Sequence, residues 1–504
     1  MSMSAQSPAV GVSLKNLLPG ARFFGADDIH VTSCSNHSLS CQPGDLFVAM
    51  LGAEHDGHDH IAAAIAQGAT AILAEQWIPS GDVPFCIVED SREALGHVCH
   101  ALAGHPAERV PVIGVTGTNG KTTTSCLIAS ILHEAGQTPA VAGTLGYCDG
   151  RRTMPAPLTT PPAPLLADWL ARSEARGATQ AVLEVSSHAL AQRRTAGFEI
   201  DVACVTNVRR DHLDFHGTLA NYKAAKARLF SQLREGGVAV LNLDDAACRE
   251  FLPALEGPVL TYGMKSDAEV TATVIERHRS EQTFLLTIGS DTVPVRTAII
   301  GDHHVANCLA AATVGLVYGI DIGTIVRGIE RITTMPGRLE RIECGQPFSA
   351  FVDYAHTPDA LEQVLGTLRQ VCTGRLICVF GAGGDRDRAK RPLMGRAVEQ
   401  GADLAIVTDD NPRREKPAAI ARQILRGFKR PGSVVVIHDR ATAIQTALAA
   451  AEPGDCVLVA GKGHESAQIV GTRHYDFDDR DVVRQWLYST DADWAAIPVL
   501  RRAA

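Results

Sequence analysis

The first stretch with recognisable chemistry is a glycine-rich turn, Gly114-Val-Thr-Gly-Thr-Asn-Gly-Lys-Thr-Thr-Thr124. The apolar run before it predicts a buried strand, and the residues after Thr122 predict a helix. Backbone N–H groups at the start of such a helix could bind phosphates, with Lys121 on the outer phosphates and a threonine hydroxyl on Mg²⁺. A strict phosphate loop has glycine where this chain has Val115, so the match is to a variant. An ordinary strand-to-helix turn is the alternative, and the spacing favours ATP binding.

Carboxylates and histidines follow the next two predicted strands. The first segment is Glu184-Val-Ser-Ser-His-Ala-Leu190, and the second is Thr206-Asn-Val-Arg-Arg-Asp-His-Leu-Asp-Phe-His216. A carboxylate at a strand end, in the same sheet as a phosphate loop, is well placed to bind Mg²⁺. Zinc is the competing interpretation for His212 and His216, but no Cys or His-x₃-His spacing supports it. Each residue alone could belong to a capped loop; together they predict a metal and phosphate site.

A third histidine-rich segment contains His55, His58 and His60. Its composition resembles a metal cluster, but no predicted strand ends beside it. We therefore expect a solvated loop at this place.

The elements that must position these residues alternate between strands and helices. Residues 1–108 combine short strands with a helix at Ile61–Gln67, and Ala103–Arg109 is a plausible linker. From residue 109 to 336, each apolar strand is followed by a polar loop and usually a helix, the rhythm of a parallel sheet covered by helices. The predicted strands there are Val112–Val115, Ala181–Val185, Val202–Val205 and Val238–Leu243. Pro161 and Pro162 are expected to begin one helix, which Gly177 ends.

Residues 337–504 repeat the rhythm, with polar loops directly after the strands. The predicted strands are Leu376–Phe380, Leu404–Thr408, Val434–Ile437 and Cys456–Ala460. Ligands of open α/β sheets bind beyond the carboxyl ends of the strands, where these loops lie. The loop after Phe380 is not a dinucleotide fingerprint, because its glycines, Gly381, Gly383 and Gly384, break the G-x-G-x-x-G spacing. NAD is therefore not expected.

Length and composition predict an enzyme of about three α/β domains. A chain of 504 residues exceeds one ordinary core. The net charge of −9 argues against nucleic acid as the main partner, and no apolar run is long enough to span a bilayer. The 13 cysteines are scattered without a CxxC pair, which suits reduced thiols, and the N-terminus lacks a signal-peptide pattern. We expect a soluble cytoplasmic enzyme; its oligomeric state is left open.

The motifs, taken in order, resemble those of the Mur ligases, the ATP-dependent amide-forming enzymes of peptidoglycan precursor synthesis. The resemblance runs from about Gly44 to Asp479. Besides the three segments above that follow strands, it rests on Asn221-Tyr-Lys-Ala-Ala-Lys226, Asp353-Tyr-Ala-His-Thr-Pro358 and Gly461-Lys-Gly-His-Glu465. The family implies three domains: a UDP-precursor domain at 1–108, a central P-loop-type ATPase domain at 109–336, and a Rossmann-like amino-acid domain at 337–504.

Within the family, the segment Asp410-Asn-Pro-Arg413 resembles the signature of members that add meso-diaminopimelate to UDP-N-acetylmuramoyl-L-alanyl-D-glutamate. Diaminopimelate differs from lysine by a carboxylate at its far end, which a guanidinium can bind through two parallel hydrogen bonds. A site built for that carboxylate could reject lysine by about 10⁴-fold. The amino-acid contacts implied by the resemblance are Arg386, Asp410, Asn411, Pro412, Arg413, Gly461 and Glu465.

The resemblance also implies a mechanism in which the D-glutamate carboxylate takes the γ-phosphoryl group of ATP and the amino acid then displaces phosphate. The implied ATP contacts are Gly117, Thr118, Asn119, Gly120, Lys121, Thr122, Thr123, Asn307, Arg338 and Asp353. The implied catalytic residues are Lys121, Glu184, His212 and Lys226. Mg²⁺ would be bound by Thr122, Glu184, His212 and Lys226, the lysine being carbamylated, since an ammonium cannot ligate a metal.

The implied contacts to the muramoyl dipeptide and its nucleotide are Ser38, Thr159, Thr160, Ser186, Gln192 and Arg194. Here the chain departs from its relatives, which usually have Asp-Ser-Arg where it has His37-Ser38-Leu39. The loop Ala53-Glu54-His55 matches a second nucleotide contact more weakly. The alternatives are a relative that adds another amino acid such as L-lysine, a folylpolyglutamate synthetase-like ligase, and a non-catalytic nucleotide-binding scaffold. The Asp-Asn-Pro-Arg segment argues against the first two, and the intact set of Lys121, Glu184, His212, Lys226 and His356 argues against the third.

Overall fold

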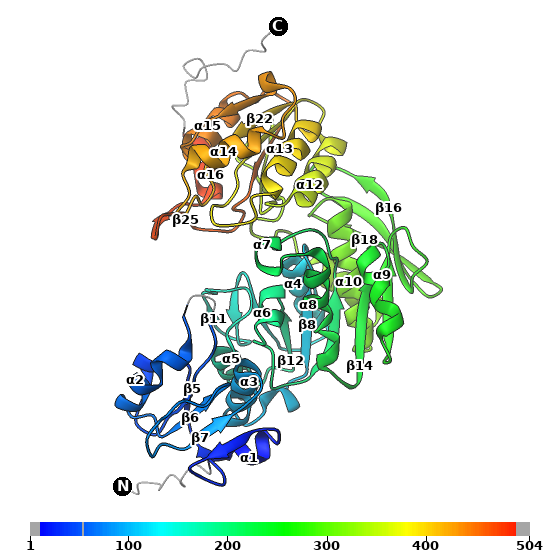
Figure 1. Cartoon of the computed structure of the whole chain (residues 1–504). Coiled ribbons are helices and arrows are strands. Elements are labelled where there is room, and N and C mark those ends of the chain that lie inside the picture. Colours follow the sequence, from blue (N-terminus) through cyan, green and yellow to red (C-terminus); the bar gives the residue numbers. More distant parts are fainter. Residues whose placement is uncertain (1–10, 53–54, 490–504) are drawn as a thin grey trace, which may run out of the picture. The chain divides into compact units, whose positions relative to one another are not determined.

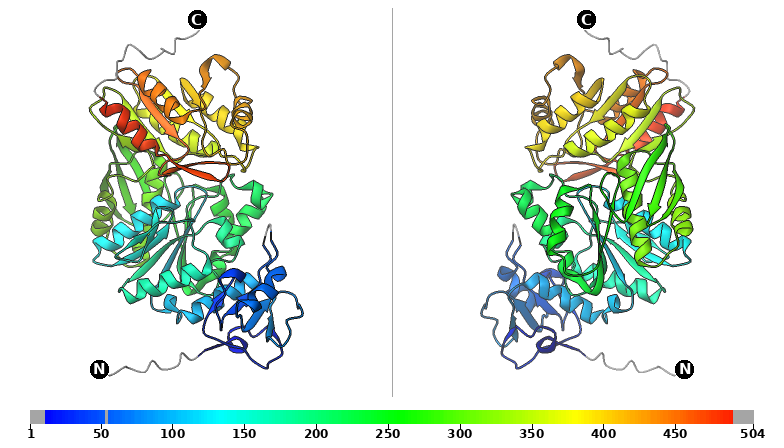
Figure 2. Two further views of the ribbon diagram at one scale, coloured as in Figure 1. Left: turned by 90° about the vertical axis from the view of Figure 1, so that its left-hand side faces the viewer. Right: turned by 90° about the vertical axis from the view of Figure 1, so that its right-hand side faces the viewer.

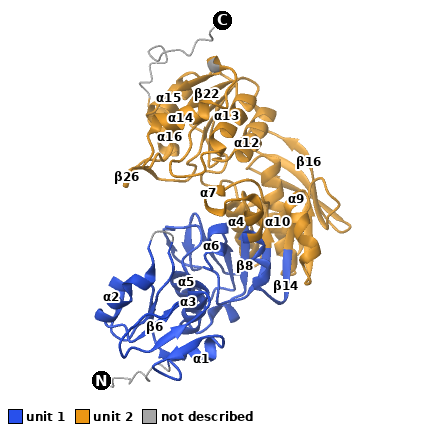
Figure 3. Ribbon diagram, in the orientation of Figure 1, with its two compact units in different colours: residues 1–116, 137–203, 225–239 blue, residues 117–136, 204–224, 240–504 orange. Residues whose placement is uncertain are grey.

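The computed structural model describes residues 11–52 and 55–489, and their contacts divide the chain into two compact units (Figures 1 and 3). Unit 1 comprises residues 1–116, 137–203 and 225–239, and unit 2 comprises residues 117–136, 204–224 and 240–504. Both consist of sheets with helices packed on them, so the predicted α/β fold class is confirmed. The predicted boundaries at 108 and 336 stay a prediction.

Unit 1 begins with a small mixed sheet whose strand order is β2-β7-β6-β5-β4, with β4 to β7 parallel and β2 antiparallel. The strands are β2 (Arg22–Phe24), β4 (Cys34–Ser35), β5 (Leu46–Val48), β6 (Ala71–Ala74) and β7 (Phe85–Ile87), beside a separate pair, β1 (Val12–Ser13) and β3 (His30–Val31). Helices α1 (Leu14–Leu17), α2 (Ile61–Ala66) and α3 (Ser91–Leu102) accompany them. The helix expected at 61–67 is thus present. Leu46, Leu73 and Val98 belong to the buried core.

The second sheet region of unit 1 has the order β11-β10-β9-β12-β8. Strands β8 (Val112–Thr116), β12 (Gln180–Glu184) and β9 (Pro139–Gly143) are parallel, whereas β10 (Gly146–Cys148) and β11 (Thr153–Met154) add an antiparallel edge. The helices are α5 (Ala163–Ala175) and α6 (Ser187–Ala191). Pro162 caps α5 and Gly177, at φ 79°, follows its end, as expected. Trp169, Leu170 and Leu183 pack in this core.

Three elements, β13 (Ile200–Val205), α8 (Leu219–Ala227) and β14 (Leu233–Asn242), pass from one unit to the other along the chain. Unit 2 contains α4 (Lys121–Glu134), α7 (Leu213–His216), α9 (Ala246–Phe251), α10 (Asp302–Val317) and α11 (Ile322–Glu330). It also contains β15 (Val259–Gly263), β16 (Val270–Arg277), β17 (Gln282–Ile288) and β18 (Asp291–Thr297). The antiparallel pairing of β16 to β18 departs from the parallel rhythm expected for this block.

The last sheet lies wholly within unit 2 and has the order β19-β20-β24-β21-β22-β23. Its strands are β19 (Glu340–Ile342), β20 (Ser349–Asp353), β21 (Leu376–Phe380), β22 (Leu404–Val407), β23 (Val434–Val436) and β24 (Cys456–Ala460); all but β19 are parallel. Successive side chains of a strand face opposite sides, so Cys378 and Phe380 belong to one apolar cluster while Ile377 and Val379 belong to another.

Helices cover both faces of this sheet (Figure 2). The helices α12 (Pro358–Val371), α13 (Lys390–Gly401) and α14 (Pro417–Leu425) supply residues to the first cluster, and α15 (Arg440–Ala449) and α16 (Asp479–Tyr488) supply residues to the second. A hairpin of β25 (Ala467–Val470) and β26 (Arg473–Asp476) follows β24. The doubly covered parallel sheet places the loops after β21, β22 and β24 at one edge, as expected. Among the described residues, no helix is both long and apolar enough to cross a membrane.

Candidate active site

The phosphate loop ends where α4 begins, at Lys121, and the residue before the helix is Gly120 at φ 87°. Gly120 stands at the N-cap and has no side chain to cap the helix, and backbone N–H groups at such a helix start suit an anionic ligand. The Lys121 ammonium donates to the carbonyls of Gly117 and Thr118 at 2.9 and 3.0 Å. A Cβ on Gly120 would lie 2.3 Å from Asn307 Oδ1, which shows how closely the loop is packed. The geometry fits a phosphate group.

The three adenosine contacts predicted beyond the loop lie close to it or to each other. Asn307 accepts from the Thr124 hydroxyl at 3.3 Å, and Arg338 donates to the Thr122 hydroxyl at 3.3 Å. The Asp353 carboxylate accepts from the N–H of Leu339, the neighbour of Arg338, at 2.6 Å. Burial raises the pKa of Asp353, and the nearby Arg338 opposes that rise. Asn307 and Arg338 therefore contact the first turn of α4, and Asp353 holds the backbone next to Arg338.

His212 lies in a charged cluster that the sequence only partly indicated. Its Nε2 is 3.3 Å from Asp211 Oδ2, and the other oxygen of Asp211 is 3.5 Å from the Lys390 ammonium. His356 is 4.0 Å from the same carboxylate. Despite the cost of burial, Lys390 and the two histidines lower the pKa of Asp211. Asp211 and Lys390 were not predicted; the only signal was the position of Asp211 beside His212.

Most of the residues predicted to contact the muramoyl dipeptide are joined by hydrogen bonds in unit 1. The Thr160 hydroxyl donates to the Glu184 carbonyl at 2.9 Å and accepts from the Ser186 N–H at 2.9 Å. Arg194 donates to the Thr160 carbonyl at 3.1 Å and to Gln192 Oε1 at 2.6 Å. The structure thus brings four of the six predicted contacts together around the end of β12.

Thr159 and Ser38 are the other two predicted contacts. Thr159 accepts a hydrogen bond from the Thr144 hydroxyl at 3.3 Å. Ser38 is buried in the 3-10 helix η1 (Ser38–Ser40), beside an exposed Leu39. The unusual His37-Ser38-Leu39 segment therefore forms a regular turn. Residues 53 and 54 of the second predicted nucleotide loop lie outside the described residues.

Glu184 is a buried carboxylate oriented by Thr144, a residue that sequence reasoning missed. Its two oxygens accept from the Thr144 N–H at 2.9 Å and from the Thr144 hydroxyl at 3.1 Å. A carboxylate oxygen held in a fixed orientation, as in Glu184, fits Mg²⁺.

Lys226 is 1% exposed, and its ammonium lies 3.5 Å from the Thr116 hydroxyl. Lysine in a helix is ordinarily exposed, and the structure buries Lys226 instead.

The histidine-rich segment near residue 58 exposes His55 and His60, as expected of a solvated loop, but it buries His58. His58 is buried in the 3-10 helix η2 (Gly57–His60), and its Nδ1 lies 2.6 Å from Asp56 Oδ1. Its Nε2 accepts from the backbone N–H of Glu75 and Gln76 at 3.3 and 3.4 Å. The role is structural. Within residues 11–52 and 55–489, no group of three or more His, Cys, Asp or Glu residues is placed so that it could hold a metal ion.

The amino-acid site predicted from sequence is assembled from the loops after β21, β22 and β24. Arg413, at φ 50°, donates to the Gly384 carbonyl at 2.8 Å. A Cβ on Gly383 would lie 3.0 Å from the Arg413 guanidinium and 3.6 Å from the Arg386 side chain. Burial, together with Arg386, lowers the pKa of Arg413. The Arg413 guanidinium and the aliphatic part of the Arg386 side chain therefore both lie beside Gly383.

Acidic groups complete this site. A Cβ on Gly461, which has a φ of 118°, would lie 2.6 Å from Asp410 Oδ2, so the loop after β24 touches the loop after β22. Asn411 donates from Nδ2 to Glu465 Oε2 at 2.8 Å. Pro412 lies between Asn411 and Arg413 in the loop after β22. Two arginine side chains close to Asp410 and Glu465 suit a ligand that carries both a carboxylate and an ammonium group.

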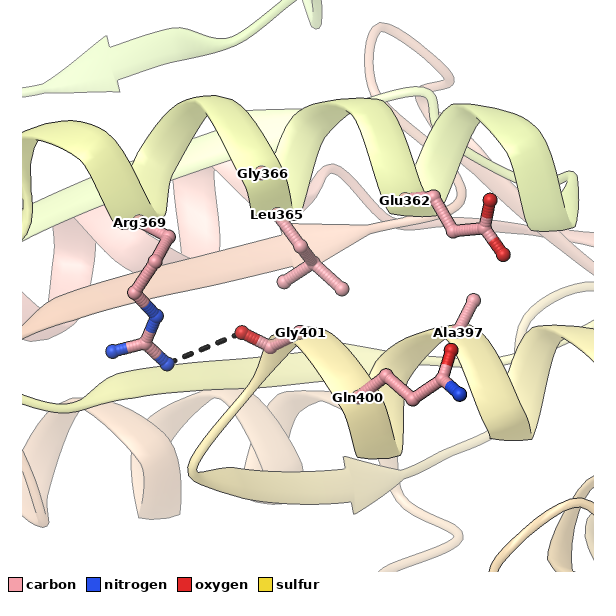
Figure 4. A pocket seen from close by; sticks show the side chains of 7 residues that line it. All are labelled: Glu362, Leu365, Gly366, Arg369, Ala397, Gln400 and Gly401. Carbon is pink, nitrogen blue, oxygen red and sulfur yellow. Dashed lines mark hydrogen bonds between the residues drawn. The ribbon is translucent and has the colours of Figure 1, made fainter.

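A cavity of about 270 Å³ elsewhere in unit 2 contains none of these residues. It lies between α12 and α13, where Arg369 donates to the Gly401 carbonyl at 3.2 Å (Figure 4). Its side chains offer no arrangement for phosphate transfer. We therefore place the candidate site at the loops and not in this cavity.

Comparison with known proteins gives matches along most of the chain. Residues 30–101 match the family described as Mur ligase family, catalytic domain; residues 115–315 match Mur ligase middle domain; and residues 337–463 match Mur ligase, glutamate ligase domain. A protein of Geobacillus thermodenitrificans, named UDP-N-acetylmuramoyl-L-alanyl-D-glutamate--2,6-diaminopimelate ligase, is 41% identical over 94% of this chain and 98% of its own. A protein of the same name from Syntrophomonas wolfei is 40% identical over 92% and 96%.

Solved structures agree with these matches. A structure of UDP-N-acetylmuramoyl-L-alanyl-D-glutamate--2,6-diaminopimelate ligase aligns with a TM-score of 0.67 and 34% identity, covering 95% of this chain and 99% of that one. MurF from Acinetobacter baumannii aligns with a TM-score of 0.61 at 20% identity, over 94% of this chain and 97% of that one, which shows a shared fold.

Proposed function

We propose that this chain, which belongs to the Mur ligase family, is an ATP-dependent ligase that adds meso-diaminopimelate to UDP-N-acetylmuramoyl-L-alanyl-D-glutamate. The observation that carries the proposal is the pairing of Arg386 and Arg413 beside Asp410 and Glu465. Diaminopimelate has a carboxylate and an ammonium group at its far end, whereas lysine has only the ammonium group. The names of the 40% identical relatives support the same substrates.

The reaction has two steps. The γ-carboxylate of the D-glutamate residue attacks the γ-phosphorus of ATP, and the bond to the β,γ-bridging oxygen breaks to release ADP and leave an acyl phosphate. An amino group of diaminopimelate then attacks the acyl carbon, an amide forms, and inorganic phosphate leaves while the nitrogen loses its proton. We propose that Lys121, at the start of α4, stabilises the negative charge on the transferring phosphoryl group.

We assign Asn307, Arg338 and Asp353 to the adenosine part of ATP, because Asn307 and Arg338 contact the first turn of α4 and Asp353 holds the residue after Arg338. The group around Thr160 at the end of β12 is assigned to the muramoyl dipeptide. Ser38 is the proposed uridine contact. We retain three domains, 1–108, 109–336 and 337–504, as the proposed division of these roles. The matched ranges 30–101, 115–315 and 337–463 are compatible with it.

Mg²⁺ is the proposed metal, with Glu184, Thr122, His212 and a carbamylated Lys226 as its ligands. When bound, it would neutralise phosphate charge. The buried Glu184 carboxylate, fixed by Thr144, supports this assignment. Lys226 is buried, and carbamylation would give it the oxygen donors that Mg²⁺ prefers. Intact-mass measurement under bicarbonate should find the carbamate, and free amine alone would contradict it.

The test of the proposed function is phosphate release from ATP in the presence of UDP-N-acetylmuramoyl-L-alanyl-D-glutamate and one amine. We expect turnover with meso-diaminopimelate and about 10⁴-fold lower kcat/KM with L-lysine, because a site built around a carboxylate discriminates strongly against its absence. Equal turnover with lysine would overturn the choice of amino acid. Absence of turnover with every amine would favour a non-catalytic scaffold.

A further inference from the structure

Lys462 is a fully buried lysine between the loops that carry the proposed amino-acid site. Its side chain is 0% exposed. The ammonium donates to Asn411 Oδ1 at 3.0 Å, to Glu465 Oε2 at 2.9 Å and to the Ala467 carbonyl at 2.6 Å. An ammonium group has three N–H donors, so these three acceptors satisfy it completely. A buried cation satisfied in this way is stable only while all of its partners remain.

The first consequence concerns the side-chain amide of Asn411. Its oxygen accepts from Lys462 and also from the Ile469 backbone N–H at 3.0 Å. Because both donors face the oxygen, the amide nitrogen must face the other way, and it donates to Glu465 Oε2 at 2.8 Å. Lys462 therefore determines which end of the Asn411 amide faces Glu465.

The second consequence concerns Glu465. Its Oε2 accepts from both Lys462 and Asn411, so the carboxylate is held in one orientation. Oε1 is then the oxygen left to accept from the ammonium group of an incoming amino acid. Lys462 thus fixes the position of this carboxylate without touching the ligand itself.

The third consequence concerns Arg413. Ala467 and Ile469 lie in β25, and the same hairpin contacts the backbone of Arg413: the Arg413 N–H donates to the Ile469 carbonyl at 3.1 Å, and the Gly471 N–H donates to the Arg413 carbonyl at 2.8 Å. Through Ala467, Lys462 therefore joins the hairpin to the two site loops. This connection restrains the left-handed backbone that aims the Arg413 side chain.

We propose that Lys462 is a positioning residue that sets the affinity for the incoming amino acid. It orients the Asn411 amide, fixes the Glu465 carboxylate and links the hairpin that supports Arg413. This inference rests on the proposed function of the site. Lys462 takes no part in phosphoryl transfer, so its loss should affect the amino acid and leave the other two substrates unaffected.

The test is Lys462→Met, which keeps the length of the side chain and removes every donor. Asn411 Oδ1 and Glu465 Oε2 then lose a charged partner inside the protein. We expect KM for meso-diaminopimelate to rise about 10-fold or more, because leaving a buried polar group unsatisfied has an effect of this size. KM for ATP and KM for the UDP-dipeptide should stay at the wild-type values.

Arg375→Met is the matched control. Arg375 is also paired with a buried carboxylate, donating to Asp455 Oδ2 at 2.7 Å, but at the opposite end of β24. Its loss should lower the melting temperature and leave all three KM values unchanged. Should Lys462→Met not fold, Lys462→Gln provides the same comparison, because its neutral amide also removes the charge.

An equal rise in all three KM values, or a lower melting temperature with an unchanged KM for the amino acid, would overturn the proposal. Failure of the proposed function would be visible separately, in the wild type. If the wild-type enzyme uses L-lysine in place of diaminopimelate, KM for lysine becomes the quantity compared among the variants. An unchanged value in Lys462→Met would then overturn the inference.

Discussion

Thr144 contacts the Glu184 carboxylate twice, through its backbone N–H to Oε1 at 2.9 Å and through its hydroxyl to Oε2 at 3.1 Å. The contact is close because Gly143 precedes Thr144: a Cβ at that position would lie 2.0 Å from Glu184 Oε1. Side chains that orient a metal-binding carboxylate typically change metal affinity by 10- to 100-fold when they are removed, as an order of magnitude.

Thr144→Val should therefore raise the Mg²⁺ concentration needed for half-maximal activity by about 10-fold. The backbone N–H remains, so the carboxylate keeps one of its two contacts. The measurement is a magnesium titration of phosphate release at saturating substrates. Thr138→Val, at an exposed threonine just before β9, is the control. An unchanged magnesium requirement in Thr144→Val would contradict the assignment of Glu184 as a Mg²⁺ ligand oriented by Thr144.

Arg413→Gln should lower kcat/KM for meso-diaminopimelate by about 100-fold or more while KM for ATP stays unchanged, because a bidentate contact to a carboxylate is lost. Glutamine preserves most of the side-chain length at a position with φ 50°. The neighbouring Arg414 is 74% exposed and pairs with Asp385 at 3.2 Å. Arg414→Gln should be close to neutral in the same assay. Comparable losses in both variants would contradict a specific role for Arg413.

The parts of the fold that could be predicted are those that a single local pattern determines. Strands β21 and β24 have the predicted ends because each is a continuous apolar run followed by a polar loop. Strands β16 to β18 were missed because the side chains of their two faces alternate and many of them are exposed or only half-buried, so no continuous apolar run marks these strands. These strands form by pairing with one another, and the composition of a single segment does not indicate such pairing.

The same distinction applies to the candidate site. Arg413 and Glu465 could be predicted from the motifs in which they occur, whereas the burial of Lys462 could not. Lysine is ordinarily exposed, and here its burial depends on Asn411, 51 residues earlier in the chain. His58 was missed for the same reason: the backbone groups it accepts from are 17 and 18 residues further along.

His100→Leu should make the stability of the protein less sensitive to mild acid. Burial, reinforced by His105 and His97, lowers the pKa of His100 from 6.5 to about 3. The unfolded chain binds a proton near pH 6.5 and the folded chain does not, so the contribution to stability is complete above pH 6.5 and is lost as the pH falls towards 3. The loss amounts to at most about 1.4 kcal/mol per pH unit within that window.

The measurement is the melting temperature of the wild type and His100→Leu at pH 7.5 and pH 5.5. The wild type should lose more than the variant between the two values. His133→Leu, which changes an exposed histidine on α4, should follow the wild type. Parallel slopes for the wild type and His100→Leu would mean that His100 is protonated in the folded protein.

Gly366→Ala should stabilise the protein by roughly 0.5–1 kcal/mol, because alanine is the better helix former in an exposed helix interior. Gly366 lies within α12, and a Cβ there would meet nothing within 4 Å. It lines the cavity between α12 and α13, away from the loops of the candidate site. Activity should therefore be unchanged while the melting temperature rises.

Gly319→Ala is the matched comparison, because a Cβ there also meets nothing within 4 Å. Gly319 follows the end of α10, however, and its φ is 68°, a conformation that costs an alanine roughly 1–2 kcal/mol. The same substitution in equally open space should therefore lower the melting temperature. Opposite shifts would show that backbone conformation decides the sign. A higher melting temperature in both variants would mean that the end of α10 relaxes to accept alanine. A lower melting temperature in both would mean that α12 needs glycine at position 366.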